Sequence, residues 1–518
     1  MAKKKAQKLM KKTNAEVTGN VNTGVNAEVD IIEEVDEYEE DGGRARANAR
    51  REVIEKVTAS DPVFRKYGPP FVVDDRGKAS INERAIAAKC AEEHTIMYDT
   101  KLCVFMRYNT ATGLWVKECE SMVRRLIGDL LLELGKKCEL LRFAQGLKVS
   151  HFTAVAKMIQ SYQVPVTTLP SSGLVHAENG VIDLRGSKPK LLDHAPGYMY
   201  TLSAGVKYDP AAKCARFEKT LLGQALEDED SLLLQKYFGS MLLGPNLTHG
   251  ILIIRGTPGG GKSTLVTIIE KILGLDLVAH LRTTHLGGRF ETSAFIGKRL
   301  LVGKDVGGDT LSNSGAHFLK SLVGGDQLQA EVKFNPKKFQ IKGDYHVAIA
   351  ANSNLKIALD GDVEAWRRRL LIVDFNRPKT TKPESNLAEK LVAEEASGIL
   401  NWMVTGALLC RKECAEKGHI VLTKTQEQRV TEMLKDSDNM PAFIDAAVVG
   451  DGDADVTGEE LLLKYREHCL SHGWKQVPGS KFQTRMPDLL CEEFGVLRRH
   501  DIKRDGRPLR GYRGIRLK

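Results

Sequence analysis

Hydrophobic residues form short continuous runs in the middle of this chain, at nearly even intervals. The runs are Ile251–Ile254, Leu300–Val302, His346–Ala351 and Leu370–Val373. Such runs are typical of strands that are buried on both faces of a parallel sheet, and the segments between them predict helices that cover those faces. The pattern therefore predicts an α/β domain that binds its ligand at the carboxyl ends of the strands.

Other spacings predict smaller elements before this domain. Residues 105–115 place polar turn residues between aromatic ones, and residues 173–185 carry Asn179-Gly180 between apolar runs, so each segment predicts a β-hairpin. Residues 121–135 have apolar residues at helical spacing, and a helix is expected over about 230–243. The first part of the chain is therefore expected to mix helices and strands.

The last segment of the chain predicts a small winged-helix domain. Thr457 and Glu460 form a capping-box pattern ahead of a helical spacing, a second helix is expected over 480–490, and residues 496–518 predict a hairpin around Asp505-Gly506. Residues 498–518 carry nine Arg or Lys against two Asp. This strip is suited to the phosphates of duplex DNA.

A chain of 518 residues is longer than one hydrophobic core usually supports. Six lysines in the first twelve residues and nine carboxylates over 28–41 predict a disordered charged tail over 1–58. The expected domains are then an N-terminal mixed domain over 61–170, a helical leader over 173–243, the α/β core over 244–378, a helical segment over 379–436 and the winged-helix domain over 440–518.

The net charge, the lengths of the apolar runs and the cysteines limit which partners and which compartment are expected. The net charge of +9 is mild and compatible with an anionic partner. No apolar run is long enough to cross a bilayer and the first residues lack the apolar part of a signal peptide, so no membrane partner is expected. Nine cysteines without a C-x-x-C pair fit a reducing cytoplasm.

A glycine-rich loop follows the first apolar run and leads into a helical pattern. It fits G-x-x-x-x-G-K-[ST] from Gly256 to Ser263, the pattern of a phosphate-binding loop. Backbone N–H groups of such a loop surround phosphates, Lys262 would reach the β- and γ-phosphates, and the Ser263 hydroxyl would bind Mg²⁺. The residues expected to bind the nucleoside triphosphate are Gly256, Thr257, Pro258, Gly259, Gly260, Gly261, Lys262, Ser263 and Thr264.

Polar residues after the later runs are the candidates for catalysis. Asp305 could hold Mg²⁺ or polarise the attacking water, and Asn352 could orient that water. Arg367 and Arg368, beside Trp366, suit an arginine finger that acts on the nucleotide of a neighbouring subunit. Each residue taken singly also has a non-catalytic interpretation that is equally good. Asp305 could be a surface aspartate, Asn352 an asparagine at a strand end, and Arg367 and Arg368 part of an exposed basic cluster.

Residues 325–342 predict two extended runs around an Asn-Pro turn. Lys333 and Phe334 near the tip would offer one cation for a phosphate and one ring for stacking on a base. The alternative is a solvated basic hairpin. A primase centre is not supported, because the carboxylates of Asp74 and Asp75 lie in a polar turn and not at the end of an apolar strand.

Together these residues resemble the superfamily 3 helicases, which are AAA+ ring motors, and in particular the phage, plasmid and poxvirus primase-helicase branch. The resemblance runs from about Leu102 to the C-terminus. In it, Gly256–Ser263 is the Walker A loop, residues 297–305 match the Walker B stretch, residues 325–333 look like the pore-lining B-prime motif, Asn352 matches the sensor asparagine and Trp366-Arg367-Arg368 matches the arginine-finger motif.

Two positions depart from that family. Many relatives place a second carboxylate beside the Walker B acid, whereas this chain has Lys304 there, so either Asp305 carries both duties or Asp309 helps. In the B-prime segment Glu331 stands where many relatives have arginine, which makes Lys333 the better candidate for DNA contact.

The resemblance implies an ATP- and Mg²⁺-dependent replicative DNA helicase that acts in the cytoplasm of a bacterial or phage-infected cell. It would form a homo-hexamer around single-stranded or forked DNA, with 3′-to-5′ polarity, and work with a primase or other replication proteins. The alternatives are an origin-binding initiator whose ATPase serves assembly, a viral-type RNA helicase, and an ATP-binding assembly protein without turnover.

Overall fold

The computed structural model describes residues 29–100, 103–161, 172–308, 311, 315–331, 333, 338–357, 359, 362–376, 384–472, 474 and 476–518. The chain divides into two compact units. The first combines residues 1–105 and 118–164, and the second combines residues 106–117 and 165–518. No helix in the described part of the chain is long and apolar enough to span a bilayer.

The first unit is mostly helical. Val123, Ile127 and Val155 form its fully buried centre, and helices α3, α4 and α6 pack around them. Its elements are α1 (Val29–Ser60), α2 (Pro62–Tyr67), β1 (Phe71–Val73), β2 (Ala79–Ile81), α3 (Glu83–Glu93), β3 (Ile96–Asp99), α4 (Glu120–Lys137), α5 (Leu141–Gln145) and α6 (Val149–Ser161). The helix predicted over 121–135 is confirmed as α4.

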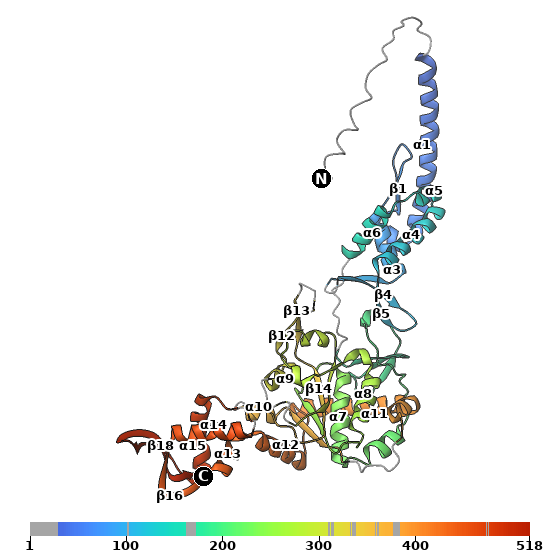
Figure 1. The fold of residues 1–518 in the computed structure, drawn as a ribbon. Helices are drawn as coiled ribbons and strands as arrows, with labels where there is room; N and C mark the ends of the chain where they lie inside the picture. Colours follow the sequence, from blue (N-terminus) through green and yellow to red (C-terminus); the bar gives the residue numbers. More distant parts are fainter. Residues whose placement is uncertain are drawn as a thin grey trace, which may run out of the picture. The chain divides into compact units, whose positions relative to one another are not determined.

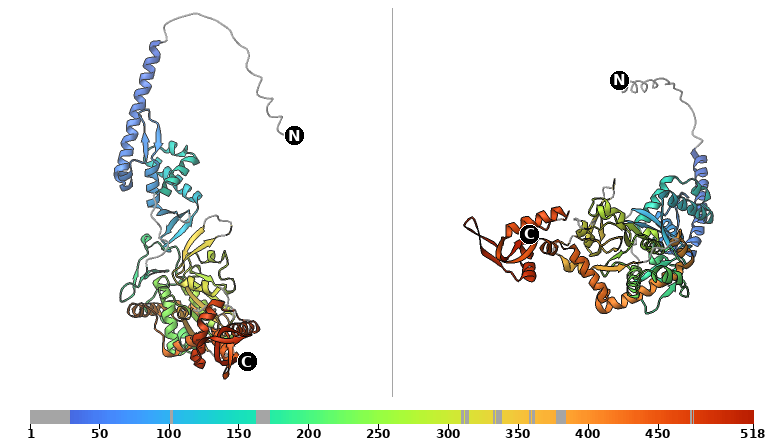
Figure 2. Two further views of the ribbon diagram at one scale, coloured as in Figure 1. Left: turned by 90° about the vertical axis from the view of Figure 1, so that its left-hand side faces the viewer. Right: turned by 60° about the horizontal axis from the view of Figure 1, so that its bottom comes forward.

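Helix α1, at the blue end of the colour scale in Figures 1 and 2, differs from the disordered tail predicted over 1–58. Residues 1–28 of that tail lie outside the described residues. Ala47 and Ile54 on α1 are 1% and 4% exposed and share a cluster with Phe64. These two apolar residues lie two helical turns apart and pack against the core, although most residues of the segment are charged or polar. The disorder prediction used the average composition of a long segment, which does not reveal one such pair.

The second unit begins with small sheets and one long helix. Its first elements are β4 (Val104–Asn109), β5 (Leu114–Glu118), β6 (Leu174–Ala177), β7 (Gly180–Asp183), β8 (Lys190–Leu192), a short 3-10 helix (Pro196–Tyr198), a π-helical turn (Phe217–Leu222) and α7 (Asp228–Leu243). Strands β4 and β5 are neighbours in one sheet, and β6 pairs antiparallel with β7 across Asn179-Gly180. Both predicted hairpins and the helix predicted over 230–243 are therefore confirmed.

A parallel sheet of five strands forms the centre of this unit, in the order β10-β11-β14-β9-β15. The strands are β9 (Ile251–Arg255), β10 (Val278–His280), β11 (Leu300–Val306), β14 (His346–Ala351) and β15 (Leu370–Asp374). All four predicted strands are confirmed, and only the short edge strand β10 escaped prediction. Because β14 lies between β9 and β11, the carboxyl ends of these three strands are neighbours.

Helices cover both faces of the sheet. Leu252 and Ile254 face a cluster that holds residues of α7, α8 (Lys262–Leu273) and α11 (Leu387–Lys417), whereas Ile251 and Ile253 face a cluster with α9 (Gly315–Val323) and α12 (Lys424–Ser437). Alternate side chains of β9 thus pack into two different cores, one on each face of the sheet. This is why the strand is apolar at every position. Three short 3-10 helices (Leu275–Leu277, Thr283–His285 and Glu291–Phe295), the hairpin β12 (Gln327–Glu331) and β13 (Lys338–Lys342), and α10 (Val363–Arg367) complete this region.

The C-terminal segment has its own core, centred on the fully buried Leu461, Tyr465 and Leu490. Its elements are α13 (Asn439–Ala447), β16 (Val448–Thr457), α14 (Gly458–Ser471), α15 (Gly479–Phe494), β17 (Arg498–Arg504) and β18 (Arg507–Leu517), with sheet order β16-β18-β17. The Thr457–Glu460 capping box is present. The two helices and the hairpin predicted here are confirmed.

Candidate nucleotide-binding site

The glycine-rich loop connects the end of β9 to the first turn of α8. A Cβ atom at Gly256 would lie 2.1 Å from the carbonyl oxygen of Phe375, so no side chain fits there. Gly261, with a φ of +101°, caps α8 in the left-handed region that favours glycine. These two glycines let the backbone turn back tightly, which directs the free N–H groups of the helix start into the loop.

Lys262 is the first residue of α8 and only 4% of it is exposed. Its ammonium donates hydrogen bonds to the carbonyl oxygens of Gly256, at 2.7 Å, and Thr257, at 2.9 Å. Burial lowers the pKa of Lys262, and the negative charge of Asp305 opposes that shift. Among the described carboxylates, none forms an ion pair with Lys262, so this buried cation fits an anionic ligand such as a phosphate group.

Two exposed oxygen-bearing side chains suit a magnesium ion. Ser263 is exposed in the first turn of α8, and Asp305 is exposed near the end of β11. No cluster of three or more metal-binding side chains occurs in the described part of the chain. A hydroxyl and one carboxylate fit Mg²⁺, because this ion commonly takes its remaining ligands from water and substrate phosphates.

A bulge in β11 determines where Asp305 points. The pairing of β11 with β14 shifts register between Gly303 and Val306, so Lys304 and Asp305 form the bulge. Asp305 has a φ of +52°, a left-handed conformation that few non-glycine residues adopt. Bulges re-aim side chains at the edges of sites, and Asp305 is exposed at this bulge.

The other bulge residue, Lys304, occupies the position at which a second carboxylate was expected from the family. Its ammonium lies 2.7 Å from a carboxylate oxygen of Glu270 and 3.2 Å from the hydroxyl oxygen of Thr267, both on α8. Glu270 is 6% exposed. The positive charge beside Asp305 is therefore matched by a buried negative charge, and the pair ties the bulge to the helix that begins with Lys262.

Asn352 follows β14 directly and is exposed. Since β14 lies between β9 and β11, the strand order brings the loop, Asn352 and Asp305 to neighbouring strand ends. The sequence predicted that the loop, Asn352 and Asp305 belong to one site, and all three follow or end strands at the carboxyl edge of the sheet. A cavity of about 550 Å³ opens beside Asp305 and adds residues that sequence reasoning missed, among them His280, Arg282 and His285.

A network of charged side chains next to the loop was also missed. Arg255, the last residue of β9, forms an ion pair with Asp374 and donates to Asn354 at 3.0 Å. Asp374 also accepts from Arg429 of α12 at 3.0 Å, and Arg429 binds both oxygens of the buried Asp230 at 2.7 Å. The network links the strand that precedes the loop to α12. No motif marks it, because its members come from four separate elements.

The two candidate finger arginines differ in their surroundings. Arg367 donates to Thr431, at 2.8 Å, and to Glu364, at 3.2 Å, within its own chain. Arg368 is exposed, and its side chain has no hydrogen bond or ion pair to any described residue. The fully buried Trp366 anchors the short helix α10, which ends at Arg367, and Arg368 is the residue that follows it.

The hairpin β12–β13 carries the candidate DNA contacts. Glu331 pairs with Arg289, at 2.7 Å, and with Lys338 of the facing strand, at 3.1 Å. These cations lower the pKa of Glu331. Lys333 is exposed in the turn, and Phe334 lies outside the described residues, as does Asp309.

Two parts of the chain match known families. Residues 83–222 match a family described as D5 N terminal like, and residues 254–369 match a family of unknown function (DUF5906). Each match covers less than half of the chain. Neither description names an activity. The first match begins upstream of Leu102, where the sequence resemblance starts.

No curated protein matches this chain. Among solved structures, an apo form of the NrS-1 C-terminal region is 13% identical over 83% of this chain and 99% of that chain, with a TM-score of 0.45. A second apo structure of that region is 14% identical over 83% and 98%, with a TM-score of 0.44. Similarity at this level assigns no function.

Proposed function

We propose that this protein is an ATP-dependent replicative DNA helicase of superfamily 3 with an AAA+ core, which works as a hexameric ring on single-stranded and forked DNA. The observation that carries the proposal is the buried ammonium of Lys262, which pairs with no described carboxylate and follows the glycine loop after β9, beside the strand ends that bear Asp305 and Asn352. The family matches support a replication role.

Each residue of the site has a role in this proposal. The loop N–H groups and Lys262 hold the phosphates of ATP, while Ser263 and Asp305 hold Mg²⁺, which neutralises charge on those phosphates. Asn352 orients the attacking water. Asp305 is also the nearest candidate to polarise that water, since the neighbouring Lys304 is a cation paired with Glu270.

Hydrolysis in a ring needs a group from the next subunit. Arg368 suits this role, because it is exposed directly after a short helix that the buried Trp366 anchors. Arg367 is already bound to Thr431 of its own chain and suits a supporting role. An arginine supplied in trans stabilises charge that develops on the transferred phosphoryl group.

The β12–β13 hairpin is the proposed DNA contact. Lys333 lies exposed in its turn, where it can bind a backbone phosphate without reading sequence. The paired Glu331 keeps Arg289 and Lys338 on the body of the hairpin. Movement of this turn with nucleotide state would carry one strand through the ring.

The C-terminal domain favours a second candidate function, that of an origin-binding initiator. Its two helices followed by a hairpin support a winged-helix assignment. Arg499, Arg513 and Arg516 form ion pairs with aspartates. Arg498, Arg507 and Arg510 are exposed and have no ion pair with any described residue, which suits contact with duplex phosphates.

ATPase stimulation tests the proposal against its alternatives. The purified protein should hydrolyse ATP with Mg²⁺, and single-stranded DNA should raise the rate more than RNA of equal length. Preference for RNA would assign an RNA helicase. Stimulation by duplex DNA alone would favour the initiator, and absence of turnover would leave an ATP-binding assembly protein.

A further inference from the structure

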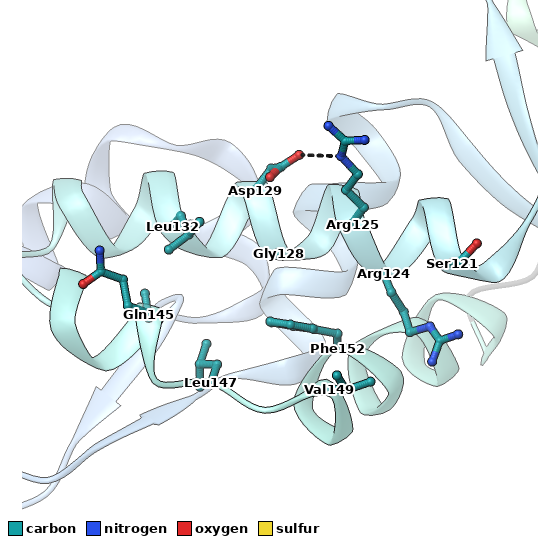
Figure 3. A pocket seen from close by; sticks show the side chains of 11 residues that line it. Ser121, Arg124, Arg125, Gly128, Asp129, Leu132, Gln145, Leu147, Val149 and Phe152 are labelled. Carbon is teal, nitrogen blue, oxygen red and sulfur yellow. Dashed lines mark ion pairs between the residues drawn. The ribbon is translucent and has the colours of Figure 1, made fainter.

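A groove of about 540 Å³ lies in the first unit, and none of the residues that line it has a role assigned above. Helix α4 forms one wall, and α5, α6 and the residues between them form the other (Figure 3). The volume lies within the roughly 300–1,000 Å³ typical of ligand pockets.

The floor of the groove is apolar and contains one aromatic ring. Phe152 lies below α4 in Figure 3, with Leu147 and Val149 beside it, and Val149 is 62% exposed. A ring and two aliphatic side chains that remain partly open to solvent form a surface on which a flat apolar group can stack.

A glycine in the middle of α4 contributes to the opening. A Cβ atom at Gly128 would lie 3.8 Å from the nearest atom of Phe152, which is ordinary contact, so packing does not require glycine there. Glycine inside a helix costs roughly 0.5–1 kcal/mol relative to alanine. The missing side chain thus leaves space above the Phe152 ring at the expense of helix stability.

Two arginines of α4 line the groove, and in Figure 3 Arg124 points to the side of α4 where Phe152 lies, whereas Arg125 points to the opposite side. Arg124 lies 3.8 Å from a carboxylate oxygen of Glu120, and Arg125 lies 3.9 Å from one of Asp129, one helical turn away in each case. Such long pairs between exposed side chains are worth little and are screened by salt. Both guanidinium groups can therefore exchange these partners for a phosphate at small cost.

We propose that this groove binds a segment of single-stranded DNA, with a base stacked on Phe152 and a backbone phosphate on Arg124. Arginine and an aromatic ring at one site are the combination that single-strand binding surfaces use. The lining holds two arginines against one aspartate, so its charge complements a polyanion. The proposal rests on the proposed function for the identity of the strand, but it does not require ATP turnover.

Binding of a labelled oligo-dT strand to the full-length protein without nucleotide, followed by fluorescence anisotropy, tests the groove. Arg124→Glu should weaken binding by about tenfold or more, since a charge-reversed phosphate contact becomes repulsive. Lys136→Glu is the matched control. It makes the same charge change at an exposed position of α4 outside the groove, and it should change affinity less than about twofold.

Gly128→Leu provides an independent variant that fills the groove. Leucine is a better helix former than glycine, so α4 should remain folded, and a melting curve checks this. Loss of stacking should weaken binding about fivefold or more. The proposal is overturned if both Arg124→Glu and Gly128→Leu bind oligo-dT like Lys136→Glu. It is also overturned if they retain oligo-dT binding but lose binding of an acidic peptide, which would assign the groove to a protein partner.

Failure of the helicase proposal would look different. A protein that does not unwind DNA, yet loses oligo-dT binding in both groove variants, would refute the motor and support the groove.

Discussion

The ammonium of Lys304 lies 2.7 Å from a carboxylate oxygen of Glu270 on α8. Lys304 is the neighbour of the proposed magnesium ligand Asp305, and Glu270 neutralises its positive charge. The Lys304 and Glu270 side chains are 26% and 8% exposed, respectively. An ion pair with one buried partner is costly to break, because the remaining charge stays poorly solvated. This pair explains how the site accommodates a lysine at a position expected to hold an acid.

Removal of the Glu270 charge should therefore weaken magnesium binding. In Glu270→Gln, Lys304 loses its carboxylate partner, and its charge competes with Mg²⁺ for the neighbouring Asp305. We expect the Mg²⁺ concentration for half-maximal ATPase to rise about fivefold, which corresponds to about 1 kcal/mol for a charge at this separation in a partly exposed site.

The double variant Glu270→Gln/Lys304→Met is the control for that prediction. It removes both charges, so the Mg²⁺ requirement should return close to that of the wild type. If the double variant is as impaired as Glu270→Gln alone, then Glu270 acts by some route other than Lys304.

Arg368→Ala should lower kcat about a thousandfold or more while nucleotide binding stays intact, as expected for a finger that acts only in the transition state. Arg367→Ala should cost far less. The same rate for Arg368→Ala and wild type would show that the finger is wrongly placed.

A mixing experiment shows whether the finger acts across subunits. Lys262→Ala destroys the site of its own subunit, and Arg368→Ala would destroy the site of its neighbour. Rings mixed from these two inactive proteins should regain part of the ATPase rate, because some interfaces combine an intact loop with an intact arginine. No recovery despite shared rings would place the arginine in its own subunit.

Lys333→Ala should uncouple hydrolysis from movement along DNA. The basal ATPase rate should remain, unwinding should fall by about tenfold or more, and the salt dependence of DNA binding should decrease by about one phosphate contact. Lys338→Ala serves as comparison, since it removes a lysine from strand β13 and not from the turn. Equal unwinding by Lys333→Ala and wild type would remove the hairpin turn from the DNA path.

Stability should decrease as the pH falls below about 6.5. Burial lowers the pKa of His346 from 6.5 to about 3, and its ring lies 3.1 Å from the carbonyl oxygen of Gly244. Between these two values the unfolded chain binds a proton that the folded chain does not, so the free energy of unfolding falls with falling pH. The melting temperature should drop less between pH 7 and pH 5 in His346→Phe than in the wild type. An equal drop would show that other groups carry this dependence.

Local patterns predicted most of the fold because they act over a few residues. The apolar runs gave four of the five sheet strands, and Asn179-Gly180 gave a hairpin at its exact turn. Strand β10 has three residues, too few for a periodic signal. Helix α1 was missed because few of its side chains among residues 44–60 are buried, whereas its overall composition is charged.

The candidate site was predictable only in its motif residues. The loop and the residues after each strand follow from the order of elements, since parallel strands end at one edge of the sheet. Two features could not be foreseen from spacing. The bulge at Lys304–Asp305 depends on pairing with β14, and the Arg255–Asp374–Arg429 network depends on how four elements pack.

Unwinding of a forked DNA duplex by purified protein, with the subunit count measured by mass under the same conditions, tests whether the protein is a ring helicase. The wild-type protein should form a hexamer that displaces one strand with ATP and Mg²⁺, and Lys262→Ala should displace none. A protein that stays monomeric with nucleotide and DNA present, and displaces no strand, would contradict this prediction.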